Sequence, residues 1–125
     1  MPRVLVVDDE ENQLKALAIG LSSNGFDVSL AATSTEALRL LAATKMDLAL
    51  IDLMMPGLNG LELARQIRRS YPAVRVVLSS AYHLSARQVE RADCGAVGFV
   101  PKPYCLGDLC GFLHAKFRPT PAASC

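Results

Sequence analysis

The sequence has no apolar run that approaches the roughly 20 residues needed for a transmembrane helix. Its first apolar stretch, Val4 to Val7, ends at four consecutive acidic residues, a pattern that does not fit a signal peptide. These two absences predict a protein that does not insert into a membrane. The cytoplasm is therefore the expected location.

The sequence also lacks an excess of charge of either sign. Lysine and arginine number 13 and aspartate and glutamate 12, so the formal net charge is +1. A protein that binds nucleic acid directly usually carries a strong basic excess, and none is present. Arg65, Arg68 and Arg69 line one stripe of an expected helix, which we interpret as solvated surface.

Cysteine patterns typical of metal sites or redox motifs are missing. None of the four cysteines forms a C-x-x-C pair, and neither histidine stands at a zinc-ligand spacing. Reduced thiols are the expected state. The four residues are Cys94, Cys105, Cys110 and Cys125.

What the sequence does contain is a regular alternation of short apolar runs and helical patterns. With 125 residues and 51% apolar composition, the chain is long enough for one domain with a substantial core. The expected strands are 3–7, 27–32, 47–52, 74–79 and 96–100. Helices are expected at 11–23, from Thr33 to 43, from the end of a loop over Met54 to Gly60 up to 69, at 84–93 and at 106–117.

Local signals mark several of these boundaries. Asn24-Gly25 supplies the left-handed residue that ends the first helix, and Thr33-x-x-Glu36 reads as a capping box. Alternating strand and helix units favour a parallel sheet with helices on both faces. Five units are too few for an eight-fold barrel, so an open, doubly wound α/β sheet is expected, with ligands beyond the carboxyl ends of its strands.

Charged side chains stand at those strand ends. Asp8 and Asp9 follow the first apolar run, Asp52 follows the third, and Lys102 lies just past the fifth. A single acidic residue at a strand end is common because loops are exposed to solvent. Several acidic residues that converge are different, because two carboxylates about 5 Å apart repel by roughly 3 kcal/mol at an effective dielectric of about 20. Either protonation of one aspartate or a bound cation would relieve this repulsion. Oxygen ligands favour Mg²⁺, with Mn²⁺ or Ca²⁺ as alternatives.

Asp52 is the candidate nucleophile of this cluster, because a carboxylate can attack phosphorus to form an aspartyl-phosphate. The cation and Lys102 would neutralise the phosphoryl oxygens. A hydroxyl from Ser79-Ser80, at the end of the fourth strand, could donate to the same group.

Four elements, taken together and in order, resemble the receiver domain of two-component response regulators. They are Asp8-Asp9-Glu10, the segment from Asp52 to Gly60, Ser79-Ser80-Ala81 and Lys102-Pro103. The resemblance covers residues 3–117. It implies a flavodoxin-like (βα)5 sandwich with a parallel five-stranded sheet in the order 2-1-3-4-5, a receiver domain over residues 1–118 and a flexible tail over 119–125.

The resemblance implies a role for each residue of the cluster. Asp52 would be the phosphoacceptor. Asp9, Asp52 and the backbone carbonyl of Met54 would ligate Mg²⁺ directly, and Asp8 would act mostly through a metal-bound water. Lys102 would contact the phosphoryl group. The chain is expected to be a phosphoacceptor and not an enzyme, with at most self-phosphorylation from small donors and slow autodephosphorylation.

The resemblance also implies a conformational switch. Ser80 matches the switch hydroxyl because Ala81 matches the small residue after it, and Ser79 is less favoured. Phe99 matches the switch aromatic, although plain core packing also explains it. Met54 and Tyr82 match positions that govern access of the hydrolytic water, and so they are expected to tune the phosphoryl lifetime.

The expected donor is a sensor histidine kinase or a histidine phosphotransfer protein. Output is expected through the face of the fourth helix, fifth strand and fifth helix, toward a downstream partner or an attached output domain, and a phosphorylation-dependent homodimer is a further expectation. Pro101, Cys105, Gly107 and Gly111 depart from the usual pattern near this face. The two glycines weaken the last helix by roughly 1 kcal/mol each relative to alanine.

Three alternatives compete with this reading. An aspartyl phosphatase would need a second aspartate at the position of Met54, and a flavodoxin-like electron carrier would need a phosphate-binding loop where the chain has Asp8 to Glu11. The third is a receiver-fold interaction module that signals without phosphorylation. The intact acidic cluster and Lys102 disfavour this module without excluding it.

Overall fold

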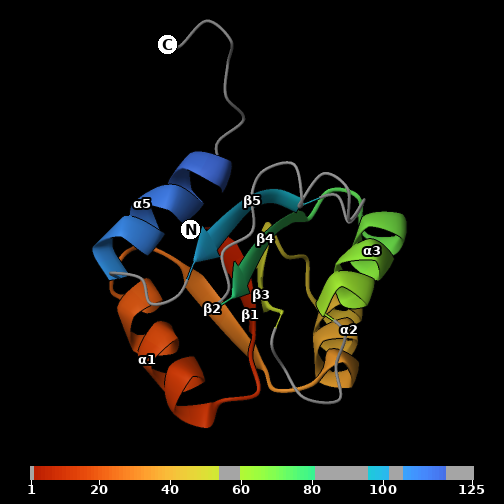
Figure 1. The fold of residues 1–125 in the computed structure, drawn as a ribbon, viewed down its shortest axis with the longest axis horizontal. Coiled ribbons are helices and arrows are strands. Elements are labelled where there is room, and N and C mark those ends of the chain that lie inside the picture. Colours follow the sequence, from red (N-terminus) through yellow and green to blue (C-terminus); the bar gives the residue numbers. More distant parts are fainter. Residues whose placement is uncertain (1, 54–59, 81–95, 102–105, 118–125) are drawn as a thin grey trace, which may run out of the picture.

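A computed structural model describes residues 2–53, 60–80, 96–101 and 106–117 of the chain (Figure 1). Its strands are β1 (Arg3–Val7), β2 (Asp27–Ala31), β3 (Leu48–Asp52), β4 (Arg75–Ser80) and β5 (Ala96–Pro101). Its helices are α1 (Glu11–Ser22), α2 (Ser34–Ala43), α3 (Gly60–Ser70) and α5 (Leu106–Phe117).

The five strands form one sheet in the order β2-β1-β3-β4-β5, and every neighbouring pair is parallel. The predicted doubly wound α/β fold, its parallel sheet and its strand order are therefore confirmed. β2 pairs with one edge of β1 and β3 pairs with the opposite edge, so the direction of the strand order reverses at β1. This reversal is the switch point, where sheets of this kind place their ligand sites.

Helices cover both faces of the sheet: α1 and α5 lie on one face and α2 and α3 on the other (Figure 1). Successive side chains of a strand point to opposite faces, so each strand contributes to two hydrophobic cores. β3 is buried at all five positions, as its unbroken apolar sequence predicts. On the α1 and α5 side, the largest core side chains include Leu21, Phe26, Leu109 and Leu113.

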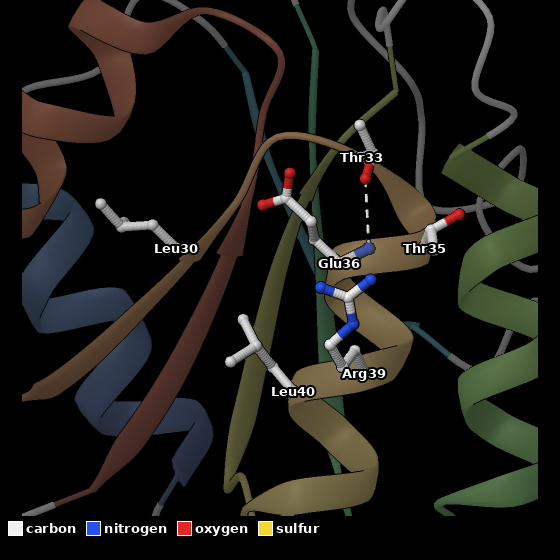
Figure 2. Close-up of a pocket in the computed structure, with 6 residues that line it drawn as sticks. All are labelled: Leu30, Thr33, Thr35, Glu36, Arg39 and Leu40. Carbon is white, nitrogen blue, oxygen red and sulfur yellow. Dashed lines mark hydrogen bonds between the residues drawn. The ribbon is translucent and has the colours of Figure 1, made fainter.

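The predicted signals at the helix ends act as expected, with one correction. Gly25 has a φ of 91°, the left-handed conformation predicted after α1. The Thr33 hydroxyl accepts a hydrogen bond from the Glu36 N–H at 3.1 Å, drawn as a dashed line in Figure 2. In a complete capping box Glu36 would accept from the Thr33 N–H, but its carboxylate instead accepts from the Ala32 N–H at 3.5 Å.

Element boundaries agree with the sequence-based prediction to within one residue, except where the structure describes nothing. β4 begins at Arg75 and runs through Ser80, one residue later than predicted at each end. This shift makes both Ser79 and Ser80 members of the strand. The helix predicted at 84–93 lies outside the described residues. Within the described ranges, no helix has the length and apolar character required to span a bilayer.

Candidate functional site

The structure brings three carboxylates together at the switch point. Asp8 and Asp9 follow β1, and Asp52 is the last residue of β3. One oxygen from each carboxylate lies within 4.8 Å of the other two. Asp8 and Asp52 are almost fully buried, with 2% and 7% of their surface exposed, whereas Asp9 is exposed. The cluster therefore combines two buried carboxylates at the edge of the sheet with a third carboxylate that is exposed to solvent.

Backbone hydrogen bonds hold the chain around these residues. The Asp8 N–H donates to the Ala31 carbonyl at 3.1 Å, and the Leu53 N–H donates to the Ser79 carbonyl at 2.8 Å. The Asp8 side chain also accepts a hydrogen bond from the Glu10 N–H at 3.0 Å, just ahead of α1. Backbone pairing between strands thus extends as far as Asp8 and Leu53, and it fixes the backbone positions from which the carboxylate side chains project.

Close packing of α3 against the end of β3 also constrains Asp52. A Cβ atom placed on Gly60, the first residue of α3, would lie 3.0 Å from the Asp52 carbonyl oxygen and 3.1 Å from the Leu53 Cα. Both of these are backbone atoms and cannot move aside easily. Glycine at position 60 therefore allows the helix to start directly against the strand that carries Asp52.

The strand registers align Asp52 with a third buried polar residue, Ser79. Val7 of β1 is level with Ile51 of β3, and Asp52 is level with Ser79 of β4. Because level residues of parallel strands point to the same face, Asp52 and Ser79 lie side by side on one face. Asp8 follows the last paired residue of β1, Val7, and extends this row of Asp8, Asp52 and Ser79 beyond the strand end. Ser79 is only 2% exposed.

Ser80 points to the opposite face of β4, together with Leu78. Phe99 of β5 is level with Leu78 and is half-buried against the core on the α2 and α3 side. Ser80 itself is 2% exposed. The two residues predicted to form the switch thus share one face of the sheet, at its carboxyl edge, while Ser79 lies on the other face.

The donor set of the acidic cluster fits a hard divalent cation. Octahedral Mg²⁺ binds oxygens at about 2.1 Å, which places opposite ligand oxygens about 4.2 Å apart. The three carboxylate oxygens lie within 4.8 Å of one another, which is of the same order. Carboxylate oxygens are the ligands that Mg²⁺, Mn²⁺ and Ca²⁺ prefer.

Three predicted site residues, Met54, Tyr82 and Lys102, lie outside the described residues, so their predicted roles stay predictions. The structure adds one observation on Ser79, namely that it is buried and level with Asp52. Strand alternation alone places Ser79 on the same face of β4 as Val77, and Asp52 on the same face of β3 as Leu50. The register that makes these residues level is not readable from the sequence.

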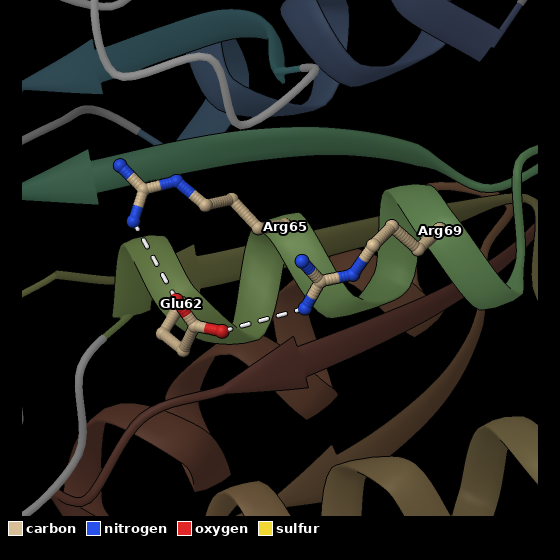
Figure 3. Close-up of polar contacts among 3 residues, drawn as sticks. All are labelled: Glu62, Arg65 and Arg69. Atoms are coloured by element: carbon tan, nitrogen blue, oxygen red, sulfur yellow. Dashed lines mark hydrogen bonds and ion pairs between the residues drawn. The ribbon is translucent and has the colours of Figure 1, made fainter.

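Two other polar features of the structure lie outside the cluster. A hollow of about 420 Å³ is lined by β2 and α2, including Leu30, Thr33 and Arg39, and none of its lining residues belongs to the acidic cluster (Figure 2). On α3, Glu62 pairs with Arg65 at 3.5 Å and with Arg69 at 3.4 Å (Figure 3). Such exposed pairs contribute little to stability.

The fold and the acidic switch-point cluster define a doubly wound α/β protein with a candidate cation site. Residues 4–114 match the response regulator receiver domain family, and the chain belongs to that family. Receiver domains are phosphorylation-regulated signalling domains and generally not enzymes, in agreement with the sequence-based expectation.

Curated proteins of similar sequence are also response regulators. The chain is 37% identical over 118 residues to the response regulator MprA of Mycolicibacterium vanbaalenii, covering 94% of this chain and 51% of that protein. The chain thus spans about half the length of the curated relatives it matches.

Solved structures show the same fold. A CheY-like receiver domain protein from Methanospirillum hungatei has a TM-score of 0.85 at 27% identity, covering 94% of each chain. The response regulator TrrA from Thermotoga maritima, solved in complex with Mg²⁺ and BeF, has a TM-score of 0.80 at 31% identity, covering 92% of this chain and 98% of that one.

Proposed function

We propose that this chain is a phosphorylation-dependent signalling switch in which Asp52 accepts a phosphoryl group from a sensor histidine kinase or a histidine phosphotransfer protein. The observation that carries the proposal is the convergence of Asp8, Asp9 and Asp52 at the switch point of a receiver domain. The complex of the related TrrA with Mg²⁺ and BeF supports it, because beryllofluoride mimics a phosphoryl group.

In the proposed reaction, a carboxylate oxygen of Asp52 attacks the phosphorus of the donor. The bond from Asp52 oxygen to phosphorus forms as the bond from phosphorus to the donor's imidazole nitrogen breaks, and the electron pair stays on the nitrogen. Asp8, Asp9, Asp52 and the Met54 carbonyl would hold Mg²⁺, which supplies positive charge to the phosphoryl oxygens. Lys102 would add a second positive charge there.

Ser80 and Phe99 would convert this charge event into a change of shape. The Ser80 hydroxyl would move toward the phosphoryl group, and Phe99, on the same face, would turn into the space left behind. The face formed by the helix predicted at 84–93, β5 and α5 would then shift its population between two states and control a partner, an output domain or a homodimer contact.

Met54 and Tyr82 would tune how long the phosphoryl group survives. Bulky apolar side chains beside Asp52 would hinder the attacking water, so Met54→Asn combined with Tyr82→Glu should accelerate phosphoryl loss. An unchanged rate of loss would refute this role.

A phosphorylation assay tests the proposed function. The protein is incubated with Mg²⁺ and acetyl phosphate, and intact mass is measured for wild type, Asp52→Asn and the control Asp27→Asn, which changes an exposed carboxylate on β2. We expect one base-labile, hydroxylamine-sensitive phosphoryl adduct in wild type and in Asp27→Asn, and none in Asp52→Asn. The absence of any adduct in wild type, with acetyl phosphate and beryllofluoride alike, would favour the interaction module that signals without phosphorylation.

A further inference from the structure

The buried Ser79 hydroxyl has no hydrogen-bond partner among the residues that the structure describes. The residue is 2% exposed, and its Oγ is the one buried side-chain polar atom, among the residues that the structure describes, that has no partner. A hydroxyl can usually rotate to find an acceptor, and burial without one is unfavourable. Such a group in a native strand therefore calls for an explanation.

Its position points to the acidic site. Ser79 is level with Asp52 in the register of β3 and β4, and both side chains belong to the face that carries Leu50 and Val77. The oxygens available to a cation belong to Asp8, Asp9 and Asp52, on the β1 and β3 side. Ser79 borders Asp52 from the β4 side, opposite to the side on which β1 pairs with β3.

We propose that the Ser79 hydroxyl donates a hydrogen bond to an oxygen of the acyl phosphate formed at Asp52. This inference rests on the proposed function. The unsatisfied donor belongs to the β4 residue that is level with Asp52, and it would gain an anionic acceptor when the site is loaded. Hydrogen bonds to charged acceptors are the stronger kind, so the gain appears as tighter binding of the phosphoryl group.

Ser79 would act separately from Ser80. The two residues are adjacent in β4, but strand alternation directs them to opposite faces of the sheet. Ser80 shares its face with Phe99, whereas Ser79 is level with Val100, on the side covered by α1 and α5. A phosphoryl group at Asp52 would thus receive one serine hydroxyl from each face of β4.

A beryllofluoride titration tests the proposal. Binding in the presence of Mg²⁺ is followed by ¹⁹F NMR for wild type, Ser79→Ala, Ser79→Thr and the control Ser29→Ala, which makes the same change in the middle of β2. Thermal unfolding of each variant is measured without ligand. We expect Ser79→Ala to weaken binding by about tenfold, while Ser79→Thr, which keeps the hydroxyl, and Ser29→Ala stay within about twofold of wild type.

Unliganded stability separates this role from a structural one. Because Ser79→Ala removes a buried donor that has no partner, the unliganded variant should melt at or above the wild-type temperature while it binds beryllofluoride more weakly. Wild-type affinity in Ser79→Ala would refute the role of Ser79 and leave the proposed function intact. A marked loss of unliganded stability would refute it too, since the hydroxyl would then be structural. Failure of wild type to bind, or binding retained by Asp52→Asn, would refute the proposed function itself and this inference with it.

Discussion

Replacing Asp52 by asparagine should stabilise the protein in the absence of divalent cations. The change keeps the shape of the side chain but removes one of two buried charges whose oxygens lie within 4.8 Å. At an effective dielectric of about 20, that pair repels by roughly 3 kcal/mol. Asp52 also makes polar interactions that the amide would reproduce only in part. We therefore expect a net gain of about 1–2 kcal/mol, which raises the melting temperature of a domain of this size by about 3–8 °C.

The measurement is thermal unfolding by circular dichroism at low ionic strength, first with EDTA and then with saturating MgCl₂. Wild type should gain stability from Mg²⁺ and Asp52→Asn should gain much less, because ligand binding stabilises only the state that binds. Asp27→Asn is the matched control: its exposed carboxylate lies 3.5 Å from Arg3, so its loss should lower stability by at most about 1 kcal/mol. A melting temperature of Asp52→Asn below that of wild type in EDTA would refute this reasoning. It would show that repulsion between the Asp8 and Asp52 carboxylates does not dominate the site when no cation is bound.

Gly60→Ala should lower the free energy of unfolding by about 1–3 kcal/mol and weaken Mg²⁺ binding, because the new Cβ would press on the Asp52 carbonyl. Gly111→Ala is the contrast: no described atom lies within 4 Å of a Cβ there, so urea unfolding should show a gain of about 0.5–1 kcal/mol in α5. Thr33→Ala removes the hydroxyl that accepts from the Glu36 N–H and should cost about 1 kcal/mol in the same assay, with an unchanged midpoint contradicting the capping role. Burial raises the pKa of the Cys110 thiol. The folded state therefore keeps the thiol protonated, and the stability that this contributes is lost as pH rises above the thiol's ordinary pKa. The melting temperature of wild type should accordingly fall faster than that of Cys110→Ala through this range, and parallel curves would contradict the assignment.

Much of the fold was predictable because its signals are local. Apolar runs of strand length alternate with helical patterns, and Gly25 and Thr33 mark helix ends through properties of single residues or short segments. The predicted position of Asp52 at a strand end likewise needed only the apolar run before it. These local features appear unchanged in the folded protein because tertiary contacts do not favour a different local structure at these positions.

The remaining features depend on how distant segments meet. The level of Ser79 relative to Asp52 is set by the register of β3 and β4, and a shift by one residue would have exchanged Ser79 with Ser80. The need for glycine at position 60 arises from the approach of α3 to β3, which no local pattern reports. The bond from the Ala32 N–H to Glu36 similarly depends on the path by which the chain leaves β2.

The row of Asp8, Asp52 and Ser79 also has a consequence for folding kinetics. Its members lie in or directly after strands that are far apart in the sequence, so the two buried carboxylates approach each other only when non-local strand pairing forms. Loop-closure entropy already makes such pairing slow, and the repulsion adds to the barrier if β1 and β3 are paired in the transition state. Neutralising Asp52 would then raise the folding rate, whereas pairing after the transition state would leave that rate unchanged and slow unfolding instead. Folding rates of the unloaded protein would therefore reveal when the signalling site is assembled.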